Sequence, residues 1–225
     1  MKKILFLFLI FYSIGVKAQN TNQYGLKIID NVLDYKRSIE LDSANSLLEI
    51  NKHIPNIKLD IRYASSNNFT GSSVYSEARA FARLPVVKAL ALVQHDLNKK
   101  GLGLKIYDAY RPYEVTIKFF DLAADKNFVA HPKNGSRHNR GCAIDLTIIN
   151  LKNGKELKMP TDYDSFSPEA SVDFKELPRR VIRNRNLLID MMSKYGFAVL
   201  YNEWWHFDFK DWKQFDLMDI PFKEL

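Results

Sequence analysis

The pattern of apolar and polar positions along this chain predicts several strands. Residues 56–63 alternate apolar and polar side chains, as a half-buried strand does. Residues 104–108 form a second short strand, residues 142–149 a third that is apolar almost throughout, and residues 197–201 a fourth. From Trp204 onward the chain continues as an extended segment in which alternate side chains share a face. Strands are therefore expected in both halves of the chain.

Between these strands, apolar residues recur at helical spacing. Residues 86–97 carry an apolar stripe, and Gly101 is placed to end that helix. Pro112 opens a second helix, which we expect to run to about Lys126, because proline is well tolerated at the start of a helix. Residues 177–195 carry a third apolar stripe. Helices and strands therefore alternate along the chain.

The start of the chain has the composition of a secretory signal peptide, which we place at residues 1–18. Two lysines precede an apolar run that is shorter than the ~20 residues a membrane-spanning helix needs. We expect cleavage near Ala18 and a secreted or periplasmic protein with no membrane span. Residues 19–56 then form a polar lead with helical segments. Together with residues 57–225 they make one globular domain.

Charge and cysteine content exclude several classes of protein. The formal charge of +7 falls to +4 when Lys2, Lys3 and Lys17 leave with the signal peptide. The remaining basic residues form no run with interleaved aromatic residues, so nucleic acid binding is not indicated. Cys142 is the single cysteine, which excludes an intramolecular disulfide.

Two separated stretches carry residues suited to a metal site. His138 and Asp145 lie on a turn and the strand after it, and His206 lies on the extended segment near the end of the chain. Three protein ligands with one open position are typical of catalytic zinc, whereas structural zinc sites have four protein ligands. Glu203, three residues before the last histidine, is placed to carry protons for a bound water. We therefore expect one zinc ion per chain.

Other roles for these residues remain open on spacing alone. A carboxylate in a buried strand needs a partner, and Asp145 could pair with Arg137 or Arg140 instead of a metal. A thiol peptidase built from Cys142 and His138 is conceivable, but no third group is evident to orient the histidine. The remaining histidines need no metal, and we expect them to be solvated: His53, His95 and His131.

Several motifs in the same order resemble the zinc D-alanyl-D-alanine dipeptidases, the group that includes the vancomycin-resistance dipeptidase. They are Ser-x-His-x-x-Gly-x-Ala-x-Asp at residues 136–145, Glu-x-Trp-His at 203–206, Asp-Ala-Tyr-Arg-Pro at 108–112, and two shorter stretches at 59–64 and 68–71. The resemblance covers roughly residues 57–210. It implies an α+β fold with a small, mostly antiparallel sheet of about four strands and packed helices, which the predicted order of elements allows.

The resemblance also implies an activity and roles for further residues. The activity is hydrolysis of the small dipeptide D-Ala-D-Ala by zinc-activated water. Arg111 matches an arginine that stabilises negative charge on the attacked carbonyl. Asp108, Tyr110 and Ser136 match positions around the substrate, with Ser136 facing its amino end.

Alternatives to this assignment remain for the residues and for the whole chain. Arg111 could simply pair with Asp108 on the surface, and Ser136 could only cap a turn. A zinc D,D-carboxypeptidase or endopeptidase acting on wall peptides would share the ligand pattern and differ in how closed its cleft is. A non-catalytic wall-binding domain would share the fold, although the intact ligands argue against it. The sequence does not indicate an oligomeric state.

Overall fold

The computed structural model describes residues 21–225, apart from the side chain of residue 127. The predicted signal peptide at residues 1–18 lies outside the described residues. Within residues 21–225, no helix combines the length and the apolar character that crossing a membrane would require.

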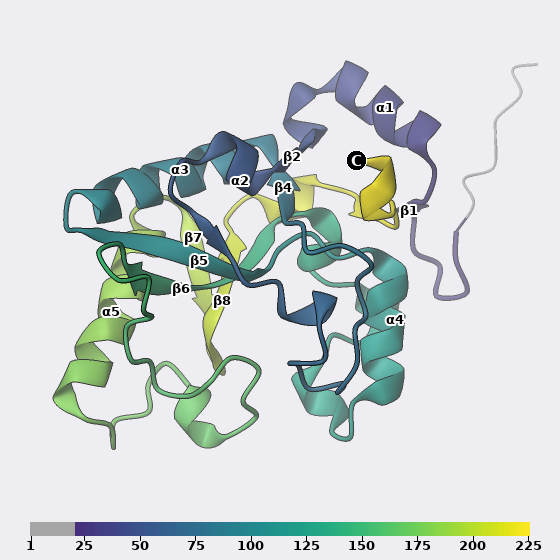
Figure 1. Cartoon of the computed structure of the whole chain (residues 1–225). Helices are drawn as coiled ribbons and strands as arrows, with labels where there is room; N and C mark the ends of the chain where they lie inside the picture. Colours follow the sequence, from purple (N-terminus) through teal and green to yellow (C-terminus); the bar gives the residue numbers. More distant parts are fainter. Residues whose placement is uncertain (1–20) are drawn as a thin grey trace, which may run out of the picture.

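A five-stranded sheet forms the centre of the molecule (Figure 1). Its strand order is β3 (Lys58–Leu59), β5 (Leu102–Asp108), β6 (Ala143–Asn150), β8 (Glu203–Phe209) and β7 (Phe197–Leu200). β3 pairs with β5 in parallel, whereas the other neighbours are antiparallel. The predicted α+β fold with a mostly antiparallel sheet is confirmed, with five strands rather than about four.

The first predicted strand is shorter than expected. Residues 56–63 supply only β3 at the sheet edge, and a 3-10 turn follows at Arg62–Ala64. The alternation arises because Ile57, Ile61 and Tyr63 are buried on the way into that turn. The alternation of apolar residues in this stretch therefore indicates which side chains are buried. Only residues 58–59 of the stretch pair with a neighbouring strand.

Three helices lie around the sheet, two where apolar stripes predicted them and one where Pro112 did (Figure 1). α3 (Leu84–Asn98) contacts β5, and α5 (Arg179–Ser193) contacts β7. Figure 1 shows α5 and α4 (Tyr113–Leu122) at opposite ends of the sheet, on the left and right of the view. α4 begins directly after Pro112 as predicted, but it ends before Lys126, where a separate 3-10 turn begins.

The lead at residues 21–56 contains strands as well as the expected helices. β1 (Ile28–Ile29) precedes α1 (Val32–Leu41), and β2 (Leu47–Glu49) precedes α2 (Ile50–His53). β1 pairs with β9 (Leu217–Met218) near the end of the chain, and β2 pairs with β4 (Phe81–Arg83). Strands this short carry too few residues for alternation to show in the sequence.

Strand register brings the predicted site residues together. Asp145 on β6 pairs directly with His206 on β8 and, on its other side, with Asp108 on β5. His138 begins a 3-10 turn that ends at Gly141, which has a φ of 68°. A Cβ at Gly141 would also lie 2.6 Å from a Leu47 methyl group. Glycine is therefore required on both counts in the turn that leads from His138 into β6.

Candidate metal centre

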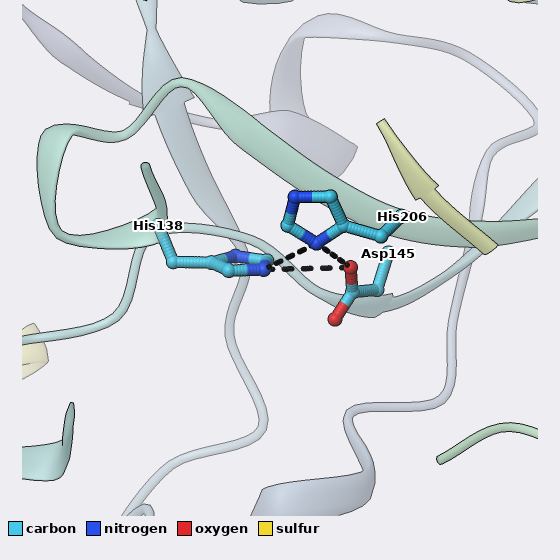
Figure 2. Close-up of side chains that lie close together, drawn as sticks. All are labelled: His138, Asp145 and His206. Carbon is cyan, nitrogen blue, oxygen red and sulfur yellow. Dashed lines mark hydrogen bonds and ion pairs between the residues drawn. The ribbon is translucent and has the colours of Figure 1, made fainter. Parts of the chain in front are cut away.

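His138, Asp145 and His206 converge on a single point (Figure 2). The Nδ1 atom of His206 lies 3.0 Å from Oδ1 of Asp145 and 3.2 Å from Nε2 of His138. The third side of this triangle, between His138 Nε2 and Asp145 Oδ1, measures 3.4 Å. All three side chains are buried. The two sequence stretches therefore meet in one three-atom cluster.

The size of this triangle fits a small metal ion. Metal–ligand bonds of about 2.0–2.1 Å in a tetrahedron give ligand–ligand distances of about 3.3 Å, close to the three observed. Oδ1 of Asp145 is buried, and the two histidine nitrogens lie 3.0 and 3.4 Å from it. A buried carboxylate is costly without a compensating positive charge, and a cation at the centre of the triangle would supply one.

Both histidines are oriented so that a ring nitrogen without a proton can face the centre. Nδ1 of His138 lies 2.7 Å from the carbonyl oxygen of Ala109, which can only accept, so this nitrogen carries the proton. Nε2 of His206 lies 2.9 Å from a carboxylate oxygen of Asp208, which fixes the other ring in the same way. Such hydrogen bonds set the tautomer and direction of metal-binding histidines.

The charges of the cluster determine what a metal ion must displace when it binds. Burial by itself raises the pKa of Asp145, but His138 and His206 outweigh this and hold that pKa below its ordinary value. Burial lowers the pKa of His206, while its hydrogen bonds to Asp145 and Asp208 raise it to about 10. The cluster thus retains a proton strongly, and a metal ion that binds here displaces it.

The competing interpretations of Asp145 and Cys142 do not fit the structure. Arg137 pairs with Asp208 at 3.4 Å, and Arg140 donates to the carbonyl of Phe215, so neither arginine neutralises Asp145. Cys142 is fully buried, and burial raises the pKa of its thiol to about 12. A thiol that stays protonated at neutral pH is a poor nucleophile.

Glu203 lies beside the cluster and lines the same pocket. Its Oε2 atom is 3.8 Å from Nδ1 of His206, the nitrogen that faces the centre, and its side chain is 21% exposed. Burial raises the pKa of Glu203, and the nearby charge of Asp145 adds to this. A carboxylate with a raised pKa, placed next to a metal position, is suited to accept and return a proton.

Arg111 enters the pocket from the end of β5. Its guanidinium group binds Oδ2 of Asp108 through two nitrogens, at 2.6 and 3.1 Å. The predicted alternative of a pair with Asp108 is therefore real, but the pair is buried rather than on the surface. Tyr75 donates to the other oxygen of Asp108 at 2.8 Å. Arg111 lines the pocket, whereas Asp108 does not, so Asp108 positions the arginine instead of contacting substrate.

Of the other two residues predicted to contact substrate, Ser136 lines the pocket and Tyr110 does not. Ser136 lines the pocket, and its hydroxyl also accepts from the backbone N–H of His138 at 3.2 Å, so it caps the turn as well. The prediction for Tyr110 is wrong. Its ring is fully buried outside the pocket, and its hydroxyl exchanges hydrogen bonds with the backbone of Ile220. Tyr110 therefore anchors the end of the chain.

Three residues at the site were not assigned a role from the sequence. Tyr163 donates a hydrogen bond of 2.9 Å to Oδ2 of Asp145, and Asp208 orients His206. Asp164 lines the pocket with φ of 60° and accepts from Tyr63 at 2.7 Å. Burial raises the pKa of Asp164 well above its ordinary value. Of the three, only Asp208 could have been found from the sequence, because it lies two residues after His206 in a strand and so shares its face.

Replacing Tyr163 with phenylalanine is expected to lower the affinity for metal by about 10- to 100-fold, as losses of hydrogen bonds to ligands typically do. The cause is loss of the donor that holds Asp145 in place. Competition with a chromophoric chelator measures the effect. Tyr107→Phe is the matched control, because its ring lies 4.7 Å from that of Tyr163 but does not line the pocket of the metal centre. If Tyr163→Phe binds metal as tightly as Tyr107→Phe does, the hydrogen bond from Tyr163 does not support the metal site.

The remaining histidines lie away from this centre. His53 and His95 are exposed, as predicted, whereas His131 is half-buried and packs beside Phe120. Among the described residues, the cluster of His138, Asp145 and His206 is the one group of metal-binding side chains found.

Comparison with known proteins gives a consistent result. The profile of the D-Ala-D-Ala dipeptidase family, peptidase M15, matches residues 43–222. The D-alanyl-D-alanine dipeptidase of Escherichia coli is 30% identical over 182 residues, which cover 81% of this chain and 94% of that protein. The enzyme of the same name from Enterococcus faecalis is 28% identical and covers 74% of this chain and 93% of its own length.

Among solved structures, the LdcB LD-carboxypeptidase aligns with 73% of this chain and 69% of its own, at 19% identity and a TM-score of 0.42. The family match carries the assignment because it spans most of the chain and includes every residue of the cluster. The chain belongs to the peptidase M15 family of D-Ala-D-Ala dipeptidases, which are metallopeptidases.

Proposed function

We propose that this protein is a zinc dipeptidase that hydrolyses D-Ala-D-Ala to D-alanine, with one zinc ion held by His138, Asp145 and His206. The observation that carries the proposal is the convergence of these three ligands with Glu203 and Arg111 around one cavity of about 250 Å³. Zinc is favoured because calcium and magnesium prefer shells made only of oxygen atoms.

When bound, zinc would supply Lewis-acid activation of both a water molecule and the substrate carbonyl. Glu203 accepts a proton from the attacking water and returns it to the amine that leaves, since one carboxylate beside the centre can serve both steps. Its raised pKa makes it a stronger base than an exposed glutamate.

Arg111 contributes fixed positive charge at the attacked carbonyl. Its guanidinium group stays charged, because the neighbouring Asp108 outweighs the effect of burial and raises its pKa. The Phe119 ring lies 4.6 Å from the same group and helps to fix its direction. A donor that is held in place before the reaction needs no reorganisation when negative charge develops on the carbonyl oxygen.

The charges that line the pocket match a substrate with a free amino group. Three carboxyl groups line it, and two of them are engaged as metal ligand and proton carrier: Asp145 and Glu203. Asp164 is the third. Burial raises its pKa, and an ammonium group bound beside it would favour the charged carboxylate, so the two groups would stabilise each other. Ser136 adds a hydroxyl group on the same pocket wall. A substrate with a charged amino terminus would thus be favoured over one whose amino end is part of a longer chain.

The cavity is also small. Its volume of about 250 Å³ falls below the range of about 300–1,000 Å³ typical of ligand pockets, so it suits a dipeptide better than a long peptide. Purified protein should therefore release D-alanine from D-Ala-D-Ala and cut the wall pentapeptide ending in the same pair poorly. Liquid chromatography of both reactions measures the ratio. If the pentapeptide is trimmed at least as well, the protein is instead a D,D-carboxypeptidase.

A further inference from the structure

Four phenylalanine rings form a continuous arch along one wall of the pocket, and all four line it. Phe119 on α4 lies at the buried end, 2% exposed, and its ring centre is 5.1 Å from that of Phe69. Phe69 lies 5.8 Å from Phe166, which stacks on Phe128 at 4.7 Å with the two rings 18° apart. Three parts of the chain thus supply one aromatic wall: Phe69, Phe166 and the stretch from Phe119 to Phe128.

The arch runs from the core to the surface. Phe166 is 37% exposed, and Phe69 and Phe128 are half-buried. The loop that carries Phe69 is held in shape by Asn68, whose side chain donates to the carbonyls of Arg62, Ser65 and Ser72. Phe69 is therefore fixed, whereas Phe166 and Phe128 come from two separate segments whose rings stack on each other.

Phe166 also lies next to the proposed binding position for the substrate amino group. Asp164 precedes it by two residues and points into the same pocket. The left-handed conformation of Asp164 turns the chain sharply there, and Tyr63 holds its carboxyl group at 2.7 Å. Asp164, Phe166 and Phe128 therefore line the same pocket, with Asp164 and Phe166 on one segment.

We propose that Phe166 and Phe128 form a gate that closes the amino-terminal side of the pocket and sets the length of the substrate at two residues. This inference rests on the proposed dipeptidase function. The stacked rings occupy the path that a third residue would take. A tripeptide is admitted only if the two segments separate, while a dipeptide fits behind the closed rings.

The test compares D-Ala-D-Ala with the same dipeptide extended by one amino-terminal residue, L-Lys-D-Ala-D-Ala. In Phe166→Ala and in Phe128→Ala, kcat/KM for the tripeptide relative to the dipeptide should rise by about 10-fold or more, since even a single methylene in a pocket is worth roughly 10- to 200-fold. The tripeptide has no ammonium group at Asp164, in the variants as in the unaltered protein. Because Asp164 is intact in all of them, this loss cancels when their tripeptide-to-dipeptide ratios are compared.

Two further variants separate a gate from a general loosening of the loops. Phe166→Tyr keeps the ring and should keep the ratio of the unaltered protein. Tyr201→Ala removes an aromatic ring that is 63% exposed and does not line the pocket, and it should also leave the ratio unchanged. An unchanged ratio in both Phe166→Ala and Phe128→Ala, with melting temperature and zinc content normal, overturns the gate. Failure of the unaltered protein on D-Ala-D-Ala would instead overturn the proposed function, before any variant is made.

Discussion

Replacing Glu203 with alanine is expected to lower kcat on D-Ala-D-Ala by about 10²- to 10⁴-fold or more, while zinc and fold remain. In this account Glu203 takes a proton from water and gives it to the departing amine, so its loss slows both steps. It contributes no metal ligand, because the three atoms that face the centre belong to other residues. The loss should therefore appear in kcat without a change in zinc stoichiometry.

Turnover, zinc content and melting temperature measured on one preparation make this prediction decisive. Glu156→Ala is the matched control, because Glu156 pairs with Lys105 at 2.9 Å and lies outside the pocket of the metal centre. Its turnover should stay within a few-fold of normal. If Glu203→Ala also keeps normal turnover per folded molecule, Glu203 is a structural residue and the proton pathway is wrong.

Replacing His206 with alanine should empty the metal site and reduce hydrolysis to the background rate. The variant removes the nitrogen that lies closest to both other ligands, at 3.0 and 3.2 Å. It also removes one partner from each of two carboxylates, Asp145 and Asp208, so a lower melting temperature is expected as well. Elemental analysis after mild dialysis measures the zinc directly.

The exposed His95 provides the control for this substitution. His95→Ala removes a histidine that lies away from the cluster, and it should keep one zinc per chain and full activity. Full zinc retention by His206→Ala would show that the ligand set is wrong. Zinc loss in both variants would indicate that purification, and not the loss of a ligand, strips the metal.

Helices and the longer strands could be predicted from the sequence because they are periodic over many residues. The stripe along α3 is one example, since Val86, Leu90, Val93 and Leu97 are all fully buried. The convergence of His138, Asp145 and His206 could not be derived from periodicity. The convergence depends on the register of β6 with β8, which the sequence pattern does not show. The resemblance to known dipeptidases supported the ligand set instead.

Site residues that lie in irregular segments could not be predicted from the sequence. Tyr163 and Asp164 lie in a loop with no repeating pattern, so nothing in the sequence indicated that they face Asp145 and the pocket. Tyr110 was assigned to the substrate through the family resemblance alone, and the structure buries its ring outside the pocket. Strand alternation could not have corrected this, because the ladder between β5 and β6 shifts register between Ile106 and Asp108.

A zinc titration of the chelator-treated protein, followed by the release of D-alanine from D-Ala-D-Ala, tests the central claim most directly. Zinc-free protein should be inactive, and activity should rise linearly and saturate at one zinc per chain. Because binding at His138, Asp145 and His206 displaces a proton, proton release should saturate at the same point. D-alanine release that is unchanged without zinc, or no release at any zinc concentration, would contradict the account.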